Sequence, residues 1–340
     1  MKIEDELKIT FDDVLIKPAY SDIVNREAEI DISVDMFGKR IAPIISSNMD
    51  YVTGVDMALA MQKAGALGII NRFENIEEQR KSYLDILLQP LIISVGIRDF
   101  IDSLNRVQIF KPNAVCIDVA HGHHKLVADL IKEVVNRGPW VIAGNVATKE
   151  GFYDLARVTS DFGGVYAIKV GIGPGSVCTT REVTGCGVPQ LSAIIECAQE
   201  RDKYFPHIKI IADGGINSSG DIVKALAAGA DAVMLGRLLA GHDECPGDTI
   251  LTSDGRSFKP YRGQSMLGAN GSRYAPEGIQ GYVPSRGPVA NTIKTLVGGI
   301  RSGFSYVGAR NIQELRDNTV FQLISSSTKS ENSTRVLEHV

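Results

Sequence analysis

Paired cysteines, long apolar runs and an excess of positive charge are all missing from this sequence of 340 residues. Its five cysteines are odd in number and scattered, which argues against a disulfide framework or a zinc site and for reduced thiols. No apolar run approaches the ~18 residues that cross a membrane, and the acidic start, MKIEDELKIT, is unlike a secretion signal. A net charge of −4 provides no basic surface for nucleic acid. We therefore expect a cytoplasmic protein without nucleic-acid or membrane partners.

Short apolar runs alternate with amphipathic segments over the first 240 residues, and this alternation predicts the fold. The predicted strands are 43–47, 67–71, 91–95, 114–119, 140–145, 166–170, 209–213 and 232–235. The predicted helices between them are 55–64, 76–87, 100–107, 124–136, 149–158, 189–201 and 219–228, the last capped by Ser219. Eight strand–helix units predict an α/β protein with a (β/α)8 TIM barrel. A doubly wound open sheet is the alternative.

The chain has no linker that would separate domains, so we expect a single barrel domain over residues 1–340. Residues 241–287 are polar and rich in Gly and Pro, and their end shows no strong helix or strand signal. Long connections of this kind in compact domains are usually functional, which predicts a mobile lid after strand 8. The polar residues from about 326 to 340 are expected to be a flexible tail.

A glycine-rich segment, KVGIGPGSVCTTR, begins at Lys169 at the end of the sixth predicted strand. Its glycines permit tight backbone conformations, and the free N–H groups of such a turn can hold a phosphate. Cys178 follows them, beside Thr180 and Arg181, and nearby N–H groups and positive charge stabilise a thiolate. Because barrel enzymes keep their chemistry at the carboxyl ends of strands, we interpret Cys178 as a nucleophile. An inert, half-buried cysteine is the alternative.

Further polar residues follow the other predicted strands. Gly215 and Gly236 follow strands seven and eight, where barrel enzymes usually bind phosphate, and Asp213 is placed to accept hydrogen bonds from ribose hydroxyls. His121 and His123 raise the possibility of a metal site, but no further ligand has suitable spacing, so a surface or supporting role is favoured. Glu277 could be a solvated charge, or a carboxylate that lid closure brings onto a bound base.

Motifs along nearly the whole chain resemble the IMP dehydrogenase/GMP reductase family. They are TFDDVLIKP (10–18), SSNMD (46–50), IDVAHGH (117–123), AGNVAT (143–148), KVGIGPGSVCTTR (169–181), IADGGI (211–216), VMLG (233–236) and LAGHDECPG (239–247). The resemblance implies a TIM barrel that assembles as a homotetramer. It also implies that a purine nucleotide monophosphate and a nicotinamide cofactor stack together at the carboxyl-terminal face.

The same resemblance implies a role for individual residues. Cys178 would attack C2 of the purine, Thr180 would assist proton transfer at the leaving group, and Glu277 would act at the base. The remaining substrate contacts would come from Met49, Ser176, Asp213, Gly215, Gly236, Tyr261, Met266 and Gly268. Asp118, Asn145 and Ser47 would bind the cofactor. Carbonyls of Gly173, Gly175 and Cys178 would form a potassium site.

Several features favour the reductase, which converts GMP to IMP and ammonia with NADPH. The chain leaves no room for the CBS pair that dehydrogenases usually carry, the lid is short, and Met49 follows an asparagine as in reductases. IMP dehydrogenase, which oxidises IMP to XMP with NAD, is the alternative, because Arg273-Tyr274 and PEGIQGYVP resemble its flap. A barrel that binds nucleotide without catalysis is a third reading, and the presence of Cys178, Thr180, Asp213 and Glu277 together argues against it.

Two positions depart from the pattern of the family. Asn71 stands where a histidine is common, which bears on contacts with the cofactor or the lid. Arg237 stands where a small residue is usual. Its guanidinium could add a bidentate phosphate contact or turn towards a subunit interface, and we count it among the candidate substrate-binding residues.

Overall fold

The protein is described here by a computed structural model that covers residues 2–73, 89–159, 164–263 and 276–331. Eight strands of this part form one parallel sheet in the order β5-β4-β11-β10-β9-β8-β7-β6. An isolated parallel bridge joins the two ends, where the Ile70 N–H donates to the Ile92 carbonyl at 3.0 Å. The sheet is therefore a nearly closed barrel, and the predicted (β/α)8 fold is confirmed.

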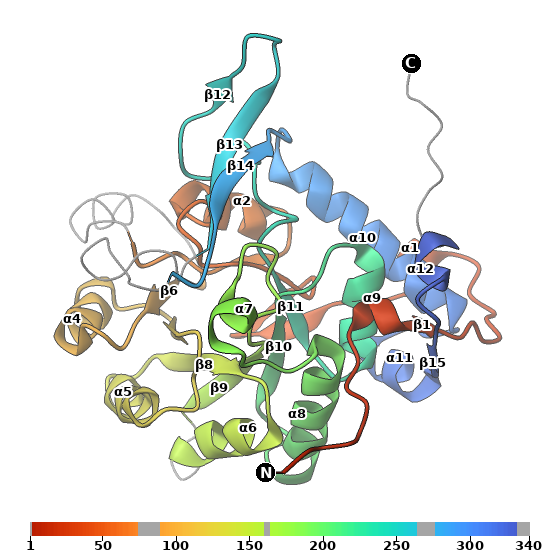
Figure 1. Ribbon diagram of the computed structural model, residues 1–340, viewed down its shortest axis with the longest axis horizontal. Coiled ribbons are helices and arrows are strands. Elements are labelled where there is room, and N and C mark those ends of the chain that lie inside the picture. Colours follow the sequence, from red (N-terminus) through yellow and green to blue (C-terminus); the bar gives the residue numbers. More distant parts are fainter. Residues whose placement is uncertain (1, 74–88, 160–163, 264–275, 332–340) are drawn as a thin grey trace.

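Every predicted barrel strand is present. The strands are β4 (Ile44–Ser46), β5 (Leu67–Gly68), β6 (Ile92–Val95), β7 (Ala114–Asp118), β8 (Trp140–Val146), β9 (Val165–Val170), β10 (Lys209–Asp213) and β11 (Ala232–Leu235). The larger helices around them are α2 (Val55–Lys63), α4 (Phe100–Phe110), α5 (Lys125–Val135), α6 (Lys149–Ala156), α8 (Gln190–Tyr204), α9 (Ser219–Ala227) and α10 (Val289–Tyr306) (Figure 1). The helix predicted at 76–87 lies outside the described residues.

Two details of the helices differ from expectation. Ser218, not Ser219, caps α9, because its Oγ accepts from the Asp221 N–H at 3.1 Å. Helix α10 was not predicted, since its glycines lower helix propensity. Those glycines allow close packing on α9: a Cβ on Gly303 would lie 2.7 Å from the Val223 side chain.

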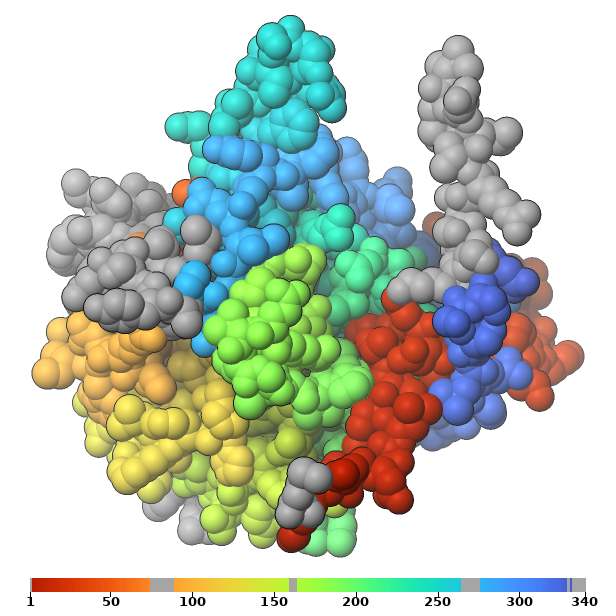
Figure 2. Space-filling model, viewed as in Figure 1, coloured from red at the N-terminus to blue at the C-terminus, as the bar shows by residue number. Residues whose placement is uncertain are grey.

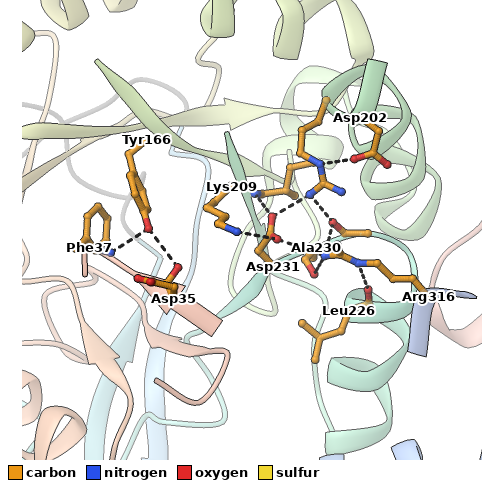
Figure 3. A network of polar contacts seen from close by, with 12 residues as sticks. Asp35, Phe37, Tyr166, Asp202, Lys209, Leu226, Ala230, Asp231 and Arg316 are labelled. Carbon is orange, nitrogen blue, oxygen red and sulfur yellow. Dashed lines mark hydrogen bonds and ion pairs between the residues drawn. The ribbon is translucent and has the colours of Figure 1, made fainter. Parts of the chain in front are cut away.

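The barrel interior is apolar because both faces of a parallel sheet are buried. A short hairpin formed by β2 (Val34–Met36) and β3 (Lys39–Ile41) adds buried side chains to this inner cluster, among them Met36 and Phe37. Tyr166 fixes the hairpin, since its hydroxyl donates to the Asp35 carbonyl at 3.2 Å and accepts from the Phe37 N–H at 3.0 Å (Figure 3). The hairpin therefore packs at the amino-terminal end of the barrel strands.

A buried ion network also lies at this end of the barrel (Figure 3). Its central residue is Asp231, which directly precedes β11 in the chain. Asp231 accepts from Arg201 Nη1 and from the Ile210 N–H, both at 2.8 Å. Lys209 and Arg316 lie 3.6 and 3.4 Å from its other oxygen. One carboxylate thus ties α8, β10 and α11 (Ile312–Asn318) together.

The segment after β11 contains strands that the sequence did not reveal. β12 (Ile250–Leu251), β13 (Ser257–Arg262) and β14 (Gln280–Pro284) form an antiparallel sheet that stands out from the body (Figure 2). The expectation of no strand near the end of 241–287 was therefore wrong. β14 gains its hydrogen bonds from β13, a distant partner that local propensity does not report.

The remaining elements are short and peripheral, apart from α7, which lies in the site. They are η1 (Phe11–Asp13), β1 (Val14–Ile16), α1 (Arg26–Glu29), η2 (Arg157–Thr159), α7 (Thr180–Thr184), β15 (Phe321–Leu323) and α12 (Thr328–Glu331). β1 pairs with β15, so segments from both ends of the chain lie side by side. Among the described helices, none combines the length and the apolar character needed to span a membrane.

Candidate active site

A cavity of about 1010 Å³ opens at the carboxyl-terminal ends of the barrel strands. Its lining brings together all the predicted site residues that the structure describes: Ser47, Met49, Asp118, Asn145, Gly173, Gly175, Ser176, Cys178, Thr180, Asp213, Gly215, Gly236, Arg237, Tyr261 and Glu277. The predicted residues Met266 and Gly268 lie outside the described part of the chain, as do Arg273 and Tyr274. A cavity of this size is at the upper end of the range for small-molecule sites.

The loop after β9 holds Cys178 in the lining of the cavity. Gly171 must be glycine, because a Cβ there would lie 2.0 Å from the Asp213 carbonyl oxygen. The Cys178 N–H closes the turn by donating to the Gly175 carbonyl at 3.1 Å. Arg181 donates to the carbonyls of Ile172 and Val188 and therefore stabilises the loop. The sequence had suggested instead that its charge stabilises the Cys178 thiolate.

Two side chains of this loop form a hydrogen-bonded relay with Glu277, which lies shortly before β14. Cys178 Sγ lies 3.1 Å from Thr180 Oγ1, and Thr180 Oγ1 donates to Glu277 Oε2 at 2.8 Å. Because the hydroxyl proton points to the carboxylate, the oxygen lone pairs are free to accept from the thiol. The backbone reinforces the arrangement, since the Thr179 N–H donates to the Glu277 carbonyl at 3.2 Å. The relay connects a thiol to a carboxylate through one hydroxyl.

Backbone and side-chain donors gather at the ends of β10 and β11. Gly215 has a φ of +78°, and within the described chain neither its N–H nor that of Gly236 has a hydrogen-bond partner. A Cβ on Gly236 would lie 3.0 Å from the Tyr261 hydroxyl, so a side chain there would crowd the cavity. Arg237 is exposed, and it has no ion-pair partner among the residues of the structure that are described. This end of the cavity therefore suits an anion.

A second group of polar side chains lies deeper, at the ends of β7 to β10. Asn145 Nδ2 donates to the Gly171 carbonyl at 2.8 Å and to Asp213 Oδ2 at 2.9 Å, which leaves Asn145 Oδ1 buried with no partner in the described residues. Lys169 Nζ donates to Asp213 Oδ2 at 3.1 Å and to Asp118 Oδ1. The group holds two carboxylates and an unused amide oxygen at fixed positions.

Sequence reasoning missed two residues that support the site, and the first is Lys169. It is the one charged residue in the apolar run VYAIKV that forms β9, and its side chain is 1% exposed. A lysine is almost never fully buried without a charged partner, and that was the available signal. Gln190 was missed as well: its Nε2 donates to the Val170 carbonyl at 2.8 Å and supports the same loop.

Asn71 and His123 make local contacts outside the relay, whereas His121 is part of the cavity lining. Asn71 is buried; its Nδ2 donates to the Thr53 carbonyl at 3.0 Å and its Oδ1 accepts from the Phe73 N–H at 2.9 Å. Its side chain therefore braces the turn after β5. His123 Nε2 lies 2.8 Å from Asp154 Oδ2, and His121 lines the cavity.

The chain is similar to proteins of one family along nearly its whole length. Residues 8–335 match the IMP dehydrogenase / GMP reductase domain. The chain is similar to an inosine-5'-monophosphate dehydrogenase of Aquifex aeolicus, with 33% identity over 96% of this chain and 95% of the relative. It is also similar to a GMP reductase of Ascaris suum, with 36% identity over 98% of this chain and 97% of the relative. A dehydrogenase of Chlorobaculum parvum is 46% identical over 69% of this chain and 50% of the relative.

Proposed function

The chain belongs to the IMP dehydrogenase/GMP reductase family, and from this premise we propose that it is a GMP reductase. The family consists of oxidoreductases that act on purine nucleotide monophosphates with a nicotinamide cofactor. The proposed reaction is GMP + NADPH + 2 H⁺ → IMP + NADP⁺ + NH₄⁺. The observation that carries the proposal is the relay from Cys178 through Thr180 to Glu277.

The relay suits a reaction that forms a thiolate and then expels ammonia. The Cys178 proton passes to Thr180 Oγ1 while the hydroxyl proton passes to Glu277, and the thiolate bonds to C2 of GMP as the C2=N3 π electrons move to N3. Glu277 then returns the proton through Thr180 to the amino group, which leaves as ammonia while C2=N3 forms again. NADPH, when bound, would supply a hydride to C2. Expulsion of the Cys178 thiolate restores C2=N3 and gives IMP, and the thiolate and the ammonia each take up a proton from solvent.

The cavity residues fit the two proposed ligands. Asn145 Oδ1, a buried oxygen with no partner among the described residues, is an acceptor suited to the carboxamide N–H of a nicotinamide, and Asp118 and Ser47 line the same cavity. At the anionic end, the N–H groups of Gly215 and Gly236 would hold the nucleotide phosphate, together with side chains of Ser176, Tyr261 and Arg237. Asp213 would accept from the ribose, and Met49, Met266 and Gly268 would contact the base.

The lengths of the alignments also support the reductase. The Ascaris GMP reductase aligns over 355 residues, close to the 340 of this chain. The Aquifex dehydrogenase needs 473 aligned positions, which shows that it contains segments that this chain lacks. Strand β5 ends at Gly68 and β6 begins at Ile92. The sequence between these two strands is too short to contain a CBS pair.

IMP dehydrogenase is the second candidate, since most of the similar proteins bear that name and PEGIQGYVP resembles its flap. A paired absorbance assay at 340 nm separates the two. GMP-dependent loss of NADPH with release of ammonia establishes the reductase, whereas IMP-dependent gain of NADH establishes the dehydrogenase. If neither occurs while GMP binds, the barrel is a binding protein.

Two further properties are proposed from the family. Carbonyls of Gly173, Gly175 and Cys178 would bind potassium, and a stimulation by K⁺ that Na⁺ does not reproduce would support that site. The chain would assemble as a homotetramer, which light scattering tests. Both properties are independent of which reaction the enzyme performs.

A further inference from the structure

Lys169 lies in a row of residues that runs across three neighbouring strands. Asp118 on β7 pairs with Gly144 on β8, and Gly144 pairs with Lys169 on β9. Neighbouring strands are about 4.8 Å apart, so β7 and β9 are separated by roughly 10 Å. Lys169 nevertheless reaches Asp118 by passing the glycine, where a Cβ would lie 2.8 Å from Lys169 Cβ. Gly144 thus provides the space in which the two side chains meet.

The same ammonium also contacts the strand on the other side. Lys169 Nζ lies 3.1 Å from Asp213 Oδ2 on β10. The side chains of Asp118 and Asp213 are 10% and 20% exposed, against 1% for Lys169. Two partly buried carboxylates, one in each proposed subsite, therefore share a single buried cation.

The charges of this group depend on one another. Burial alone would lower the pKa of Lys169, but Asp118 and Asp213 outweigh it and hold the pKa above the usual value. Burial would raise the pKa of Asp118, but Lys169 outweighs it and the pKa is lowered. Without the ammonium, Asp118 would lose the largest of the interactions that lower its pKa and would keep those of Arg72 and Asn48 against burial, which raises a carboxyl pKa by up to about 3–5 units.

We propose that Lys169 is a positioning residue that serves both subsites at once, holding Asp213 ionised for the nucleotide ribose and Asp118 ionised for the cofactor. The inference rests on the proposed function only in assigning these two carboxylates to the two ligands. An ionised carboxylate offers both oxygens as acceptors to two ribose hydroxyls, whereas a protonated carboxyl uses one of them as a donor. Lys169 itself is not among the described residues that line the cavity.

Three titratable groups that act on Asp118, Lys169 or Asp213 keep their charge between pH 6.5 and 8.5: Arg72, Cys116 and Tyr261. Arg72 acts on Asp118 and is charged throughout. Burial raises the pKa of Cys116 to about 12. Burial also raises the pKa of Tyr261, which faces Asp213. Burial and the two neighbouring histidines lower the pKa of His121, which lines the cavity.

The test is to measure the binding of IMP and of NADPH, separately, to Lys169→Met between pH 6.5 and 8.5. If NADPH does not bind the wild type, NADH takes its place. A carboxyl with a raised pKa loses its charge as the pH falls, so affinity should be present at pH 8.5 and lost towards pH 6.5. The ratio of the variant's affinity to that of the wild type at the same pH removes the effect of titration of the ligand phosphates. We expect this ratio to fall about 10-fold for IMP and for NADPH between pH 8.5 and pH 6.5.

Two variants serve as controls for charge and for surface effects. Lys169→Arg keeps the cation and should restore a flat pH profile. Lys125→Met removes an exposed lysine, 82% exposed on α5, and should match the wild type. A flat profile for both ligands in Lys169→Met would show that the lysine only stabilises the fold, and dependence for one ligand alone would refute the shared role.

A second variant covers the case in which Lys169→Met does not fold. Asp118→Asn combined with Lys169→Met removes one charge of each sign and leaves Asp213 with its Asn145 contact. IMP binding should still acquire the pH dependence, and a flat profile would overturn the proposal. IMP is a ligand of either candidate reaction, so this result does not depend on whether the wild type reduces GMP.

Discussion

Replacing Glu277 by glutamine tests the relay most directly. Thr180 Oγ1 donates to Glu277 Oε2 at 2.8 Å, and a glutamine oxygen can accept the same bond. The amide cannot take up the proton, so the relay keeps its geometry and loses its terminal base. General acid–base catalysis contributes about 10²–10⁴-fold, which corresponds to roughly 2.7–5.4 kcal/mol of barrier. We expect GMP-dependent NADPH oxidation to slow by a factor in this range.

Three measurements separate loss of the base from loss of the site. Single-turnover kinetics should show the decrease in the chemical step, while the Kd of GMP stays within about 3-fold of wild type. The melting temperature should be unchanged, because the side chain of Glu277 is only half-buried. Glu182→Gln, an exposed glutamate on α7, is the matched control and should retain full rate. A Glu277→Gln enzyme with wild-type single-turnover rate would refute the relay.

Three other substitutions test separate parts of the structure. Cys178→Ala should abolish turnover and leave GMP binding intact by calorimetry; residual turnover near wild type would contradict the covalent step. Arg237→Ala should weaken GMP binding about 10-fold or more, since a hydrogen bond to a charged group contributes about 1.5–3 kcal/mol, whereas Arg256→Ala, on the β12–β14 sheet, should have no effect. Asp231→Asn removes the buried charge partner of the Arg201 side chain, which is 5% exposed, and leaves only the exposed Asp202, at a cost of about 3–5 kcal/mol. With about 0.7 kcal/mol per degree for 340 residues, its melting temperature should fall by about 4–7 °C; a change no larger than that of the exposed Asp254→Asn would contradict the ion network.

Sequence reasoning was most successful for elements whose residues are adjacent in the chain and form a local pattern. Each barrel strand is a short apolar run beside a helix, so composition and periodicity marked it. The candidate residues at the strand ends then followed from the architecture, because all parallel strands present their carboxyl ends to one face. Cys178, Asp213 and Gly236, which are far apart along the chain, all line the same cavity.

Sequence reasoning failed where a residue depends on a distant partner. Strand β14 is a strand because β13 pairs with it, and α7 interrupts a loop that appeared continuous. Arg181 seemed to be a cation for the thiolate, yet it binds the carbonyls of Ile172 and Val188. Hydrogen-bond partners of this kind are chosen by side-chain direction, which the spacing of residues does not report.

The sequence by itself determined the barrel, the face on which its chemistry lies and the family, because these depend on local periodicity and on motifs of adjacent residues. Only the tertiary structure decided how the parts act together. It placed Glu277 against Thr180, 97 residues away, and it joined Asp118 to Asp213 through Lys169. The physical reason is that a buried charge is stable only beside its partners, and those partners come from strands that meet only when the barrel closes.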